Sequence, residues 1–213
     1  MSDTTPTGSR SDHLRASPPL LPIASLDKLT RVHHLVPVVI YVPAIVVLLV
    51  LSLGRTSVLG TIGLFTAGYL MWTLAEYWIH RVVFHFEPED GWGAKVHFLI
   101  HGVHHEHPND PLRLVMPPLA SLPLAIAFAL LYRWVFGADM WMPVTAGFIA
   151  GYVIYDELHY LLHHYVPTNP IGRRLRELHM RHHFQDDTRG YGVSAPVWDY
   201  VFRTPARRRR PAR

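Results

Sequence analysis

The sequence contains no cysteine, and this absence removes several kinds of site at once. It excludes disulfides, thiolate zinc sites and cysteine-ligated iron–sulfur clusters, so any metal must be bound by histidine or carboxylate side chains. The chain also lacks a G-x-G-x-x-G loop, so it cannot draw electrons from a pyridine nucleotide by itself. The H-E-x-x-H motif of zinc hydrolases is absent as well.

Charged residues are scarce, at 17%, whereas 49% of the residues are hydrophobic. The 20 Lys and Arg against 16 Asp and Glu give a net charge of +4, which taken alone is compatible with nucleic-acid binding. Long apolar runs indicate a membrane partner instead, and no nucleic acid is expected. Lysine is nearly missing, with 2 Lys against 18 Arg, which is typical of a bacterium with GC-rich DNA.

Four apolar runs predict the fold class. They cover residues 35–53, 58–79, about 117–132 and 142–162, and each is long enough, or nearly so, to cross the hydrocarbon core. A tight turn joins the first two runs, and a short connection joins the last two. The sequence therefore predicts an all-α integral membrane protein with four transmembrane helices in two hairpins.

The distribution of positive charge predicts the orientation. The turns after the first and third runs contain only Arg55 and Arg133, whereas the termini and the middle loop hold the other 18 Lys and Arg. Both termini and the middle loop are therefore expected on the cytoplasmic side of a multi-pass protein. Together with the arginine bias, this favours a bacterial inner membrane.

Sixteen histidines are the chain's most unusual feature, and ten of them form four clusters. The spacing H-x-x-H-H occurs twice, at His101, His104 and His105 and again at His179, His182 and His183; two pairs add His80 with His85 and His159 with His163. In a helix each triplet would point its imidazoles the same way.

Ten histidines are too many for one ion, so two metal ions are expected, bound in a cytoplasmic histidine-rich helical cap. His80 and His85 lie about 140° apart around an α-helix, so they should serve different ions unless the helix breaks between them.

Two acids near the ends of apolar runs and several other histidines have expected supporting roles. Glu76 precedes His80 by one helical turn, and Asp156 precedes His159, where it is expected to orient the imidazole through its other ring nitrogen. Neither acid is expected to bind metal. The remaining histidines are predicted to be disordered (His13), interfacial (His33 and His34), solvated (His107), or supporting or surface residues (His97 and His164).

Residues 1–33 are predicted to be a polar, largely disordered segment. Residues 1–17 contain little to bury, and residues 25–32 have the spacing of a short interfacial helix. Residues 34–213 are expected to form the membrane domain.

The histidine clusters and their neighbours resemble a known family. The matching segments are EYWIHRVVFH (76–85), HGVHH (101–105), RLVMPP (113–118), GYVIYDELHYLLHH (151–164), HMRHHF (179–184), RGYGV (189–193) and WDYVF (198–202). Together they resemble the fatty acid 2-hydroxylases of the fatty acid hydroxylase and sterol desaturase superfamily. The resemblance implies that residues 34–213 are a membrane hydroxylase domain, with the same ten histidines as ligands and no catalytic residue beyond the metal centre.

The implied reaction is an O2-dependent hydroxylation of a fatty acyl chain at its 2-position. The working ions are expected to be iron, because zinc has no redox chemistry, although purified protein could contain zinc. Eukaryotic members often carry an N-terminal haem domain, and the segment before residue 35 leaves no room for one, so a separate electron-donor protein is expected. The arginines at 207–210 and 213 are expected to lie on anionic lipid, with donor docking as the alternative.

Other functions remain open from the residues alone. A metal cap at the membrane interface suits a lipid substrate within the bilayer, and a sterol or carotenoid would be reached as well as an acyl chain. Only the amino-acid sequences of the motifs favour the acyl chain. A metal transporter is the non-enzyme alternative, although transporters hold their ligands near mid-bilayer in broken helices.

Overall fold

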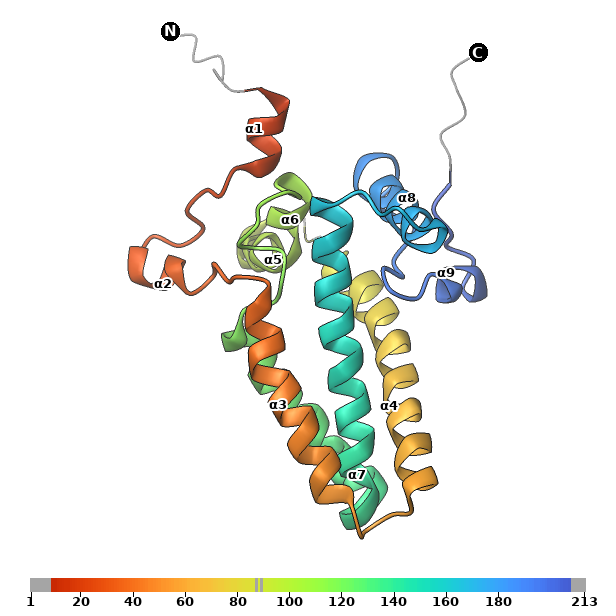
Figure 1. Cartoon of the computed structure of the whole chain (residues 1–213). Helices are drawn as coiled ribbons and strands as arrows, with labels where there is room; N and C mark the ends of the chain where they lie inside the picture. Colours follow the sequence, from red (N-terminus) through yellow and green to blue (C-terminus); the bar gives the residue numbers. More distant parts are fainter. Residues whose placement is uncertain (1–8, 87, 89, 208–213) are drawn as a thin grey trace, which may run out of the picture.

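The computed structural model describes residues 9–86, 88 and 90–207, and within them the chain is mostly helical and contains no strand. Three of its helical stretches are long and apolar enough to cross a membrane: α3 (Leu35–Ser52), α4 (Val58–Trp78) continued by η1 (Ile79–Phe84), and α7 (Pro118–His164). These form the tapering bundle in the lower part of Figure 1. The shorter helices at its upper end are α1 (Arg10–Arg15), α2 (Ala24–Lys28), α5 (Gly91–His97), η2 (Phe98–Gly102), α6 (Val103–Glu106), α8 (Pro170–Phe184) and α9 (Val197–Val201).

Gly137 interrupts α7 and turns the chain back on itself. Its φ of 75° and ψ of −172° are not helical, and glycine adopts such angles at little cost. Rings from the two halves of α7 then meet, with the Phe148 centroid 4.5 Å from that of Phe128 and 5.3 Å from that of Tyr132. In Figure 1 the first half passes behind α3 and the second half rises between α3 and α4. The helix thus supplies two antiparallel rods, one for each apolar run of the sequence.

Glycines bring α4 and the second half of α7 into backbone contact. A Cβ placed on Gly68 of α4 would lie 2.0 Å from the carbonyl oxygen of Val144, and one on Gly147 of α7 would lie 1.9 Å from the carbonyl oxygen of Phe65. Small residues at such crossings let helices approach closely where no hydrophobic effect drives them together. The contact is reciprocal, so it fixes the separation of these helices at two points.

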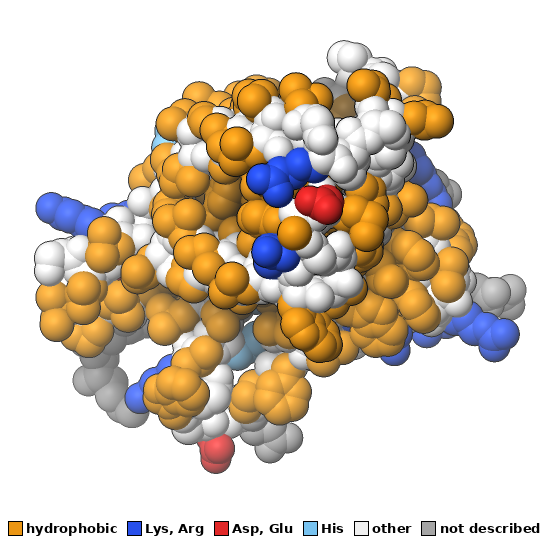
Figure 2. All heavy atoms as spheres, turned by 90° about the horizontal axis from the view of Figure 1, so that it is seen from below, with side chains coloured by type: hydrophobic (Ala, Val, Ile, Leu, Met, Phe, Trp, Pro, Cys, Tyr) orange, Lys and Arg blue, Asp and Glu red, His pale blue; other side chains and the backbone are white. Residues whose placement is uncertain are grey.

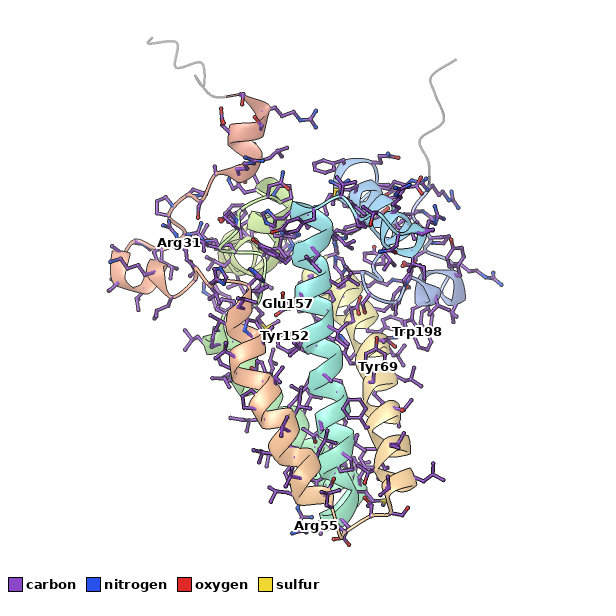
Figure 3. All side chains as sticks on the ribbon, in the orientation of Figure 1. Arg31, Arg55, Tyr69, Tyr152, Glu157 and Trp198 are labelled. Carbon is purple, nitrogen blue, oxygen red and sulfur yellow. The ribbon has the colours of Figure 1, made fainter. Side chains whose placement is uncertain are left out.

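The surface of the bundle is apolar all round. Figure 2, which looks up from the narrow end, shows hydrophobic side chains around the perimeter and a small group of charged side chains at the tip. At that tip Arg55 lies 3.7 Å from Asp139, and Figure 3 shows Arg55 at the lower turn. Large apolar side chains such as Leu59 and Trp134 are about four-fifths exposed. A surface of this kind suits contact with hydrocarbon rather than water, as expected for a membrane protein.

The N-terminal segment is more ordered than its composition predicts. Residues 10–15 form α1, which a capping box at Ser9 begins, and α2 occupies part of the predicted interfacial helix. We call residues 17–32 the strap, because Arg113 holds them from the middle loop. Arg113 donates to Asp27 at 3.3 Å and to the hydroxyls of Ser17 and Thr30. Residues 1–8 of the predicted disordered stretch lie outside the described residues.

Candidate metal centre

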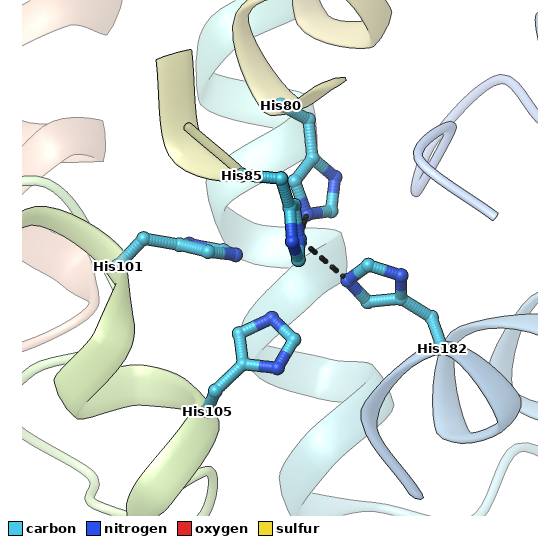
Figure 4. Close-up of side chains that lie close together, drawn as sticks. All are labelled: His80, His85, His101, His105 and His182. Carbon is cyan, nitrogen blue, oxygen red and sulfur yellow. Dashed lines mark hydrogen bonds between the residues drawn. The ribbon is translucent and has the colours of Figure 1, made fainter. Parts of the chain in front are cut away.

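The ten clustered histidines gather into two groups of five at the upper end of the bundle. The first group is His80, His85, His101, His105 and His182, and the second is His104, His159, His163, His179 and His183. Within each group, one nitrogen from every ring lies within 4.8 Å of the corresponding nitrogen of the others. Figure 4 shows the rings of the first group converging from three separate parts of the chain.

A π-helix explains why His80 and His85 belong to the same group. The segment η1 continues α4 with one extra residue per turn, and the amide of His85 donates to the carbonyl of His80 at 3.1 Å. Residues five apart therefore lie over one another, and the two Nε2 atoms are 3.3 Å apart. The expectation that these two histidines serve different ions, drawn from α-helical geometry, is wrong for this reason. A second π-helix, η2, carries His101.

The middle histidine of each H-x-x-H-H triplet crosses to the other group. His104 leaves its neighbours on η2 and α6 and joins the second group, and His182 leaves its neighbours on α8 and joins the first. Three histidines on one helical face were expected to act together, and the structure divides them two and one. Each triplet therefore contributes to both groups, which ties α6 and α8 to one another.

Distances within the groups fit metal coordination. Nε2 of His163 lies 2.8 Å from Nε2 of His179, and Nε2 of His183 lies 3.1 Å from those of His104 and His179. In the first group Nε2 of His85 lies 3.1 Å from that of His182 (dashed in Figure 4). Two imidazole nitrogens bound to one ion at about 2.0–2.1 Å would be separated by roughly 2.8–3.4 Å for bond angles between 90° and the tetrahedral value. The spacing thus suits one ion in each group.

The groups have the protonation state that metal binding requires. Burial, together with the neighbouring imidazoles, lowers the pKa of His85 and His104 to about 3. For the same reason, burial first, the pKa falls below its usual value at His101, His105, His179, His182 and His183. At neutral pH these rings are uncharged, and a neutral imidazole offers a lone pair to a metal ion. In the first group, Nε2 of His101 and Nε2 of His105 are buried without a hydrogen-bond partner among the described residues, as expected of atoms that would bind an ion.

Backbone carbonyls of the C-terminal segment orient two rings of the first group. Nδ1 of His80 donates to the carbonyl of Tyr191 at 2.7 Å, and Nδ1 of His182 donates to the carbonyl of Arg189 at 2.8 Å. These bonds leave Nε2 of both rings free to face the group. The carboxylate of Asp199 holds the segment by accepting from the amides of Tyr191 and Gly192, each at 2.9 Å. Sequence reasoning missed Asp199, and nothing in its spacing could have revealed a contact with backbone amides.

Glu76 supports the same segment rather than a ring. Its carboxylate accepts from the amide of Ser194 at 2.8 Å and also from the Ser194 hydroxyl. Nearby, the indole of Trp198 donates to the hydroxyl of Thr73 on α4 at 3.1 Å. Glu76 therefore acts on the first group through the loop that carries the Tyr191 carbonyl, one step further away than its position before His80 predicts.

Asp156 does not make the contact expected of it. Neither ring nitrogen of His159 has a hydrogen-bond partner among the described residues, so the carboxylate does not orient this imidazole. Asp156 lies instead near the Tyr152 hydroxyl and the backbone amide of Met116, and it is almost fully buried. One helical turn separates the acid from the histidine, but no hydrogen bond joins their side chains.

Several histidines outside the two groups form hydrogen bonds that connect segments of the cap. Nδ1 of His107 donates to the carbonyl of His13 at 2.7 Å, so His107 is buried rather than solvated, and His13 is part of the described structure. Nε2 of His97 donates to the carbonyl of Phe84 at 2.6 Å, which is the supporting role expected of it. Nδ1 of His34 lies 3.0 Å from a carboxylate oxygen of Glu157.

Comparison with known proteins identifies a family that contains this chain. A family model described as fatty acid hydroxylase matches residues 65–204. Over 166 residues the chain is 39% identical to dihydroceramide fatty acyl 2-hydroxylase FAH2 of Arabidopsis thaliana, covering 78% of this chain and 70% of the relative. It is 38% identical to ceramide very long chain fatty acid hydroxylase SCS7 of Saccharomyces cerevisiae, covering 84% of this chain and 47% of the relative.

The other comparisons agree. Fatty acid 2-hydroxylase of Homo sapiens is 40% identical over 67% of this chain and 39% of its own length. A solved structure titled "Full length scs7p (only hydroxylase domain visible)" has a TM-score of 0.79 and 38% identity, over 84% of this chain and 69% of that chain. The chain therefore spans most of some relatives and less than half of others. The matched region includes all ten clustered histidines, and the chain belongs to the fatty acid hydroxylase family.

Proposed function

We propose that this protein is a membrane-bound oxygenase that hydroxylates fatty acyl chains at the 2-position. The observation that carries the proposal is the pair of neutral five-histidine groups at one end of an apolar helical bundle, in a chain of the fatty acid hydroxylase family. In the reaction, a C–H bond is converted to C–OH, O2 supplies the oxygen atom, and two electrons and two protons reduce the other oxygen atom to water.

All ten histidines are proposed as ligands, five to each of two ions. Iron is the proposed metal, because activating O2 to break a C–H bond requires an ion that changes oxidation state. The protein's own part is to hold neutral imidazoles and to fix their direction. His80 and His182 do this through carbonyl hydrogen bonds, and burial keeps protons off the rings. No further side chain is assigned to the chemistry.

The proposed topology has four transmembrane helices in two hairpins, formed by α3 with α4 and by the two halves of α7 about Gly137. Residues 34–213 would make up this hydroxylase domain, preceded by the N-terminal segment. The asymmetry of Lys and Arg supports a cytoplasmic location for the termini and the histidine groups, since Arg55 lies at the opposite tip from Arg31 in Figure 3. The arginine bias, together with this charge asymmetry, favours a bacterial inner membrane, whereas the relatives named above are eukaryotic.

The position of the groups suits a lipid substrate. They lie where the spanning helices end, so a lipid in the bilayer could present the carbons next to its polar head while its tail remains in the hydrocarbon. The names of the relatives, which refer to fatty acyl, ceramide and fatty acid hydroxylation, favour an acyl chain over a sterol or a carotenoid. The same position argues against a metal transporter, whose ligands would lie near mid-bilayer.

Lipid analysis tests the proposal. The wild-type protein and the His104→Ala variant would be expressed separately in the same host. Total lipids from each culture would be hydrolysed and analysed by mass spectrometry. The expected product is a 2-hydroxy fatty acid that appears with the wild type alone and takes up label from oxygen-18 gas. Oxidised sterols or carotenoids with unchanged acyl chains would instead establish the alternative substrate. Products that persist in the variant would come from the host and would refute the proposal.

A further inference from the structure

The outward side of α8 carries a basic groove that the metal centre does not use. Residues of α8 spaced three and four apart form a single stripe along the helix, and residues 166–167 close one edge of it. The groove has a volume of about 620 Å³, and its principal side chains are Arg173, Arg176, Glu177, Met180, Arg181 and Phe184. We call this the α8 groove. It lies on the upper right of the molecule in Figure 1, across the cap from α5.

The α8 groove is positively charged and partly preorganised. Three arginines line it against one glutamate. Nε of Arg173 donates to the carbonyl of Pro167 at 3.2 Å, and Nε of Arg176 donates to the carbonyl of Tyr165 at 3.1 Å. These bonds fix both side chains by one nitrogen and leave the terminal nitrogens for other partners. Held in this way, a guanidinium loses less freedom when it binds a carboxylate.

Only the thickness of one helix separates the α8 groove from the second histidine group. The same helix supplies His179 and His183 from its inner side, and an α-helix with its side chains is about 10–12 Å across. Met180 directly follows His179, and the ring of Phe184 lies 6.1 Å from the ring of His183. Soft and aromatic side chains thus line the shortest route from the groove to the metal centre.

We propose that the α8 groove is the docking surface for an acidic, one-electron carrier protein. The inference rests on the proposed oxygenase function, which requires two electrons per turnover that this chain cannot supply alone. The partner is a small protein whose flavin, haem or iron–sulfur cluster lies near an edge surrounded by carboxylates, and it is oxidised by one electron at each visit. Carboxylates pair with Arg173 and Arg176, while the cofactor edge approaches Met180 and Phe184.

This surface fits the partner better than the C-terminal arginines do. Residues 208–213 lie outside the described residues, and Arg207, which follows α9 in the chain, does not line the α8 groove. Anionic lipid is the other partner that arginines attract, but the apolar side chains in the α8 groove adjoin the histidines of α8 itself. A route for electrons explains that arrangement, and a headgroup site does not require it.

The test compares two ways of reducing the same enzyme. Purified full-length protein would be assayed for 2-hydroxylation with an acidic [2Fe–2S] ferredoxin and its reductase, and separately with dithionite and methyl viologen, which need no docking surface. The test variant is Arg173→Glu with Arg176→Glu, and Arg173→Lys with Arg176→Lys keeps the charge. A matched control, Lys95→Glu with Arg203→Glu, reverses two exposed charges elsewhere.

The expected result is a rise of about tenfold or more in the KM for ferredoxin in the Glu variant, with a weaker dependence on ionic strength. The Lys variant, which keeps the charge but loses the two Nε hydrogen bonds, shows a smaller rise in KM than the Glu variant. The matched control retains the wild-type KM, and all variants keep the rate supported by dithionite. An unchanged KM for ferredoxin in the Glu variant would overturn the docking proposal. So would an equal loss with both reductants, or a loss of binding to anionic vesicles with ferredoxin kinetics intact. A wild type that forms no product even with dithionite would refute the oxygenase function itself.

Discussion

Replacing Gly147 by alanine tests how closely the two main helices must pack. The new Cβ would lie 1.9 Å from the carbonyl oxygen of Phe65 and 2.7 Å from its carbonyl carbon. Real Cβ contacts do not fall below about 3 Å, so α4 and α7 must separate by roughly 1 Å at this point. A backbone carbonyl cannot rotate away as a flexible side chain could, and the reciprocal contact of Gly68 with Val144 would open as well.

The size of the effect follows from two opposing terms. Overpacking a well-packed contact costs about 1–3 kcal/mol, and the upper end applies here because the obstacle is backbone. Alanine regains about 1 kcal/mol over glycine in a helix. The net loss is therefore about 2 kcal/mol, which for a chain of this length lowers Tm by about 4–8 °C.

Thermal unfolding in detergent measures the change, with Gly63→Ala as the control. Gly63 lies on the same helix as Gly68, but a Cβ there would meet nothing within 4 Å. This control should gain stability from helix propensity alone, by about 1 kcal/mol. Equal melting temperatures for Gly147→Ala and Gly63→Ala would refute the argument, because they would show that the helices can separate without loss.

Three further predictions concern the metal centre and the strap. The purified protein should contain close to two ions per chain by elemental analysis, and His182→Ala should lower that number, whereas an unchanged number would contradict the grouping. Asp199→Ala should also release metal, because it frees the Tyr191 amide and so loosens the residue whose carbonyl orients His80. Asp156→Asn should retain metal, and the reverse order would show that Asp156 is a ligand. Arg113→Met should make the strap more sensitive to limited proteolysis without changing the metal content. A cleavage rate equal to that of the wild type would show that the ion pair between Arg113 and Asp27 does not hold the strap in place.

The apolar helices could be predicted from the sequence because burial in a bilayer leaves a long, uncharged signature. The run predicted at 35–53 is α3, and the run at 58–79 is α4 with the first residue of η1. Gly137 was not singled out, since a glycine that reverses the chain and one that packs a helix look alike in sequence. The order of α1 and the strap was missed because it depends on contacts with the distant middle loop. His107 bonds to His13 of α1, and Arg113 bonds to Asp27 of the strap.

The identity of the clustered histidines was also predictable, but their partition was not. Spacings of three and four residues imply a shared face only if the helix is α, and the π-helix η1 changes that rule for His80 and His85. Which ring of a triplet crosses to the other group depends on how α6 and α8 face each other, and this is set by packing between distant segments. Contacts through backbone carbonyls, such as that of His80 with Tyr191, leave no mark in side-chain patterns.

The crossing of His104 and His182 has a consequence for how the protein acquires its metal. An ion that fills the first group draws on His182 and so immobilises α8, which carries His179 and His183 of the second group. The conformational entropy lost in ordering that helix would then already be lost when the second ion arrives, so we expect the second ion to bind more tightly than the first. Under metal shortage the population would divide into empty and full molecules, with few that hold a single ion. The exchange of one histidine in each direction would then disfavour molecules that hold a single ion.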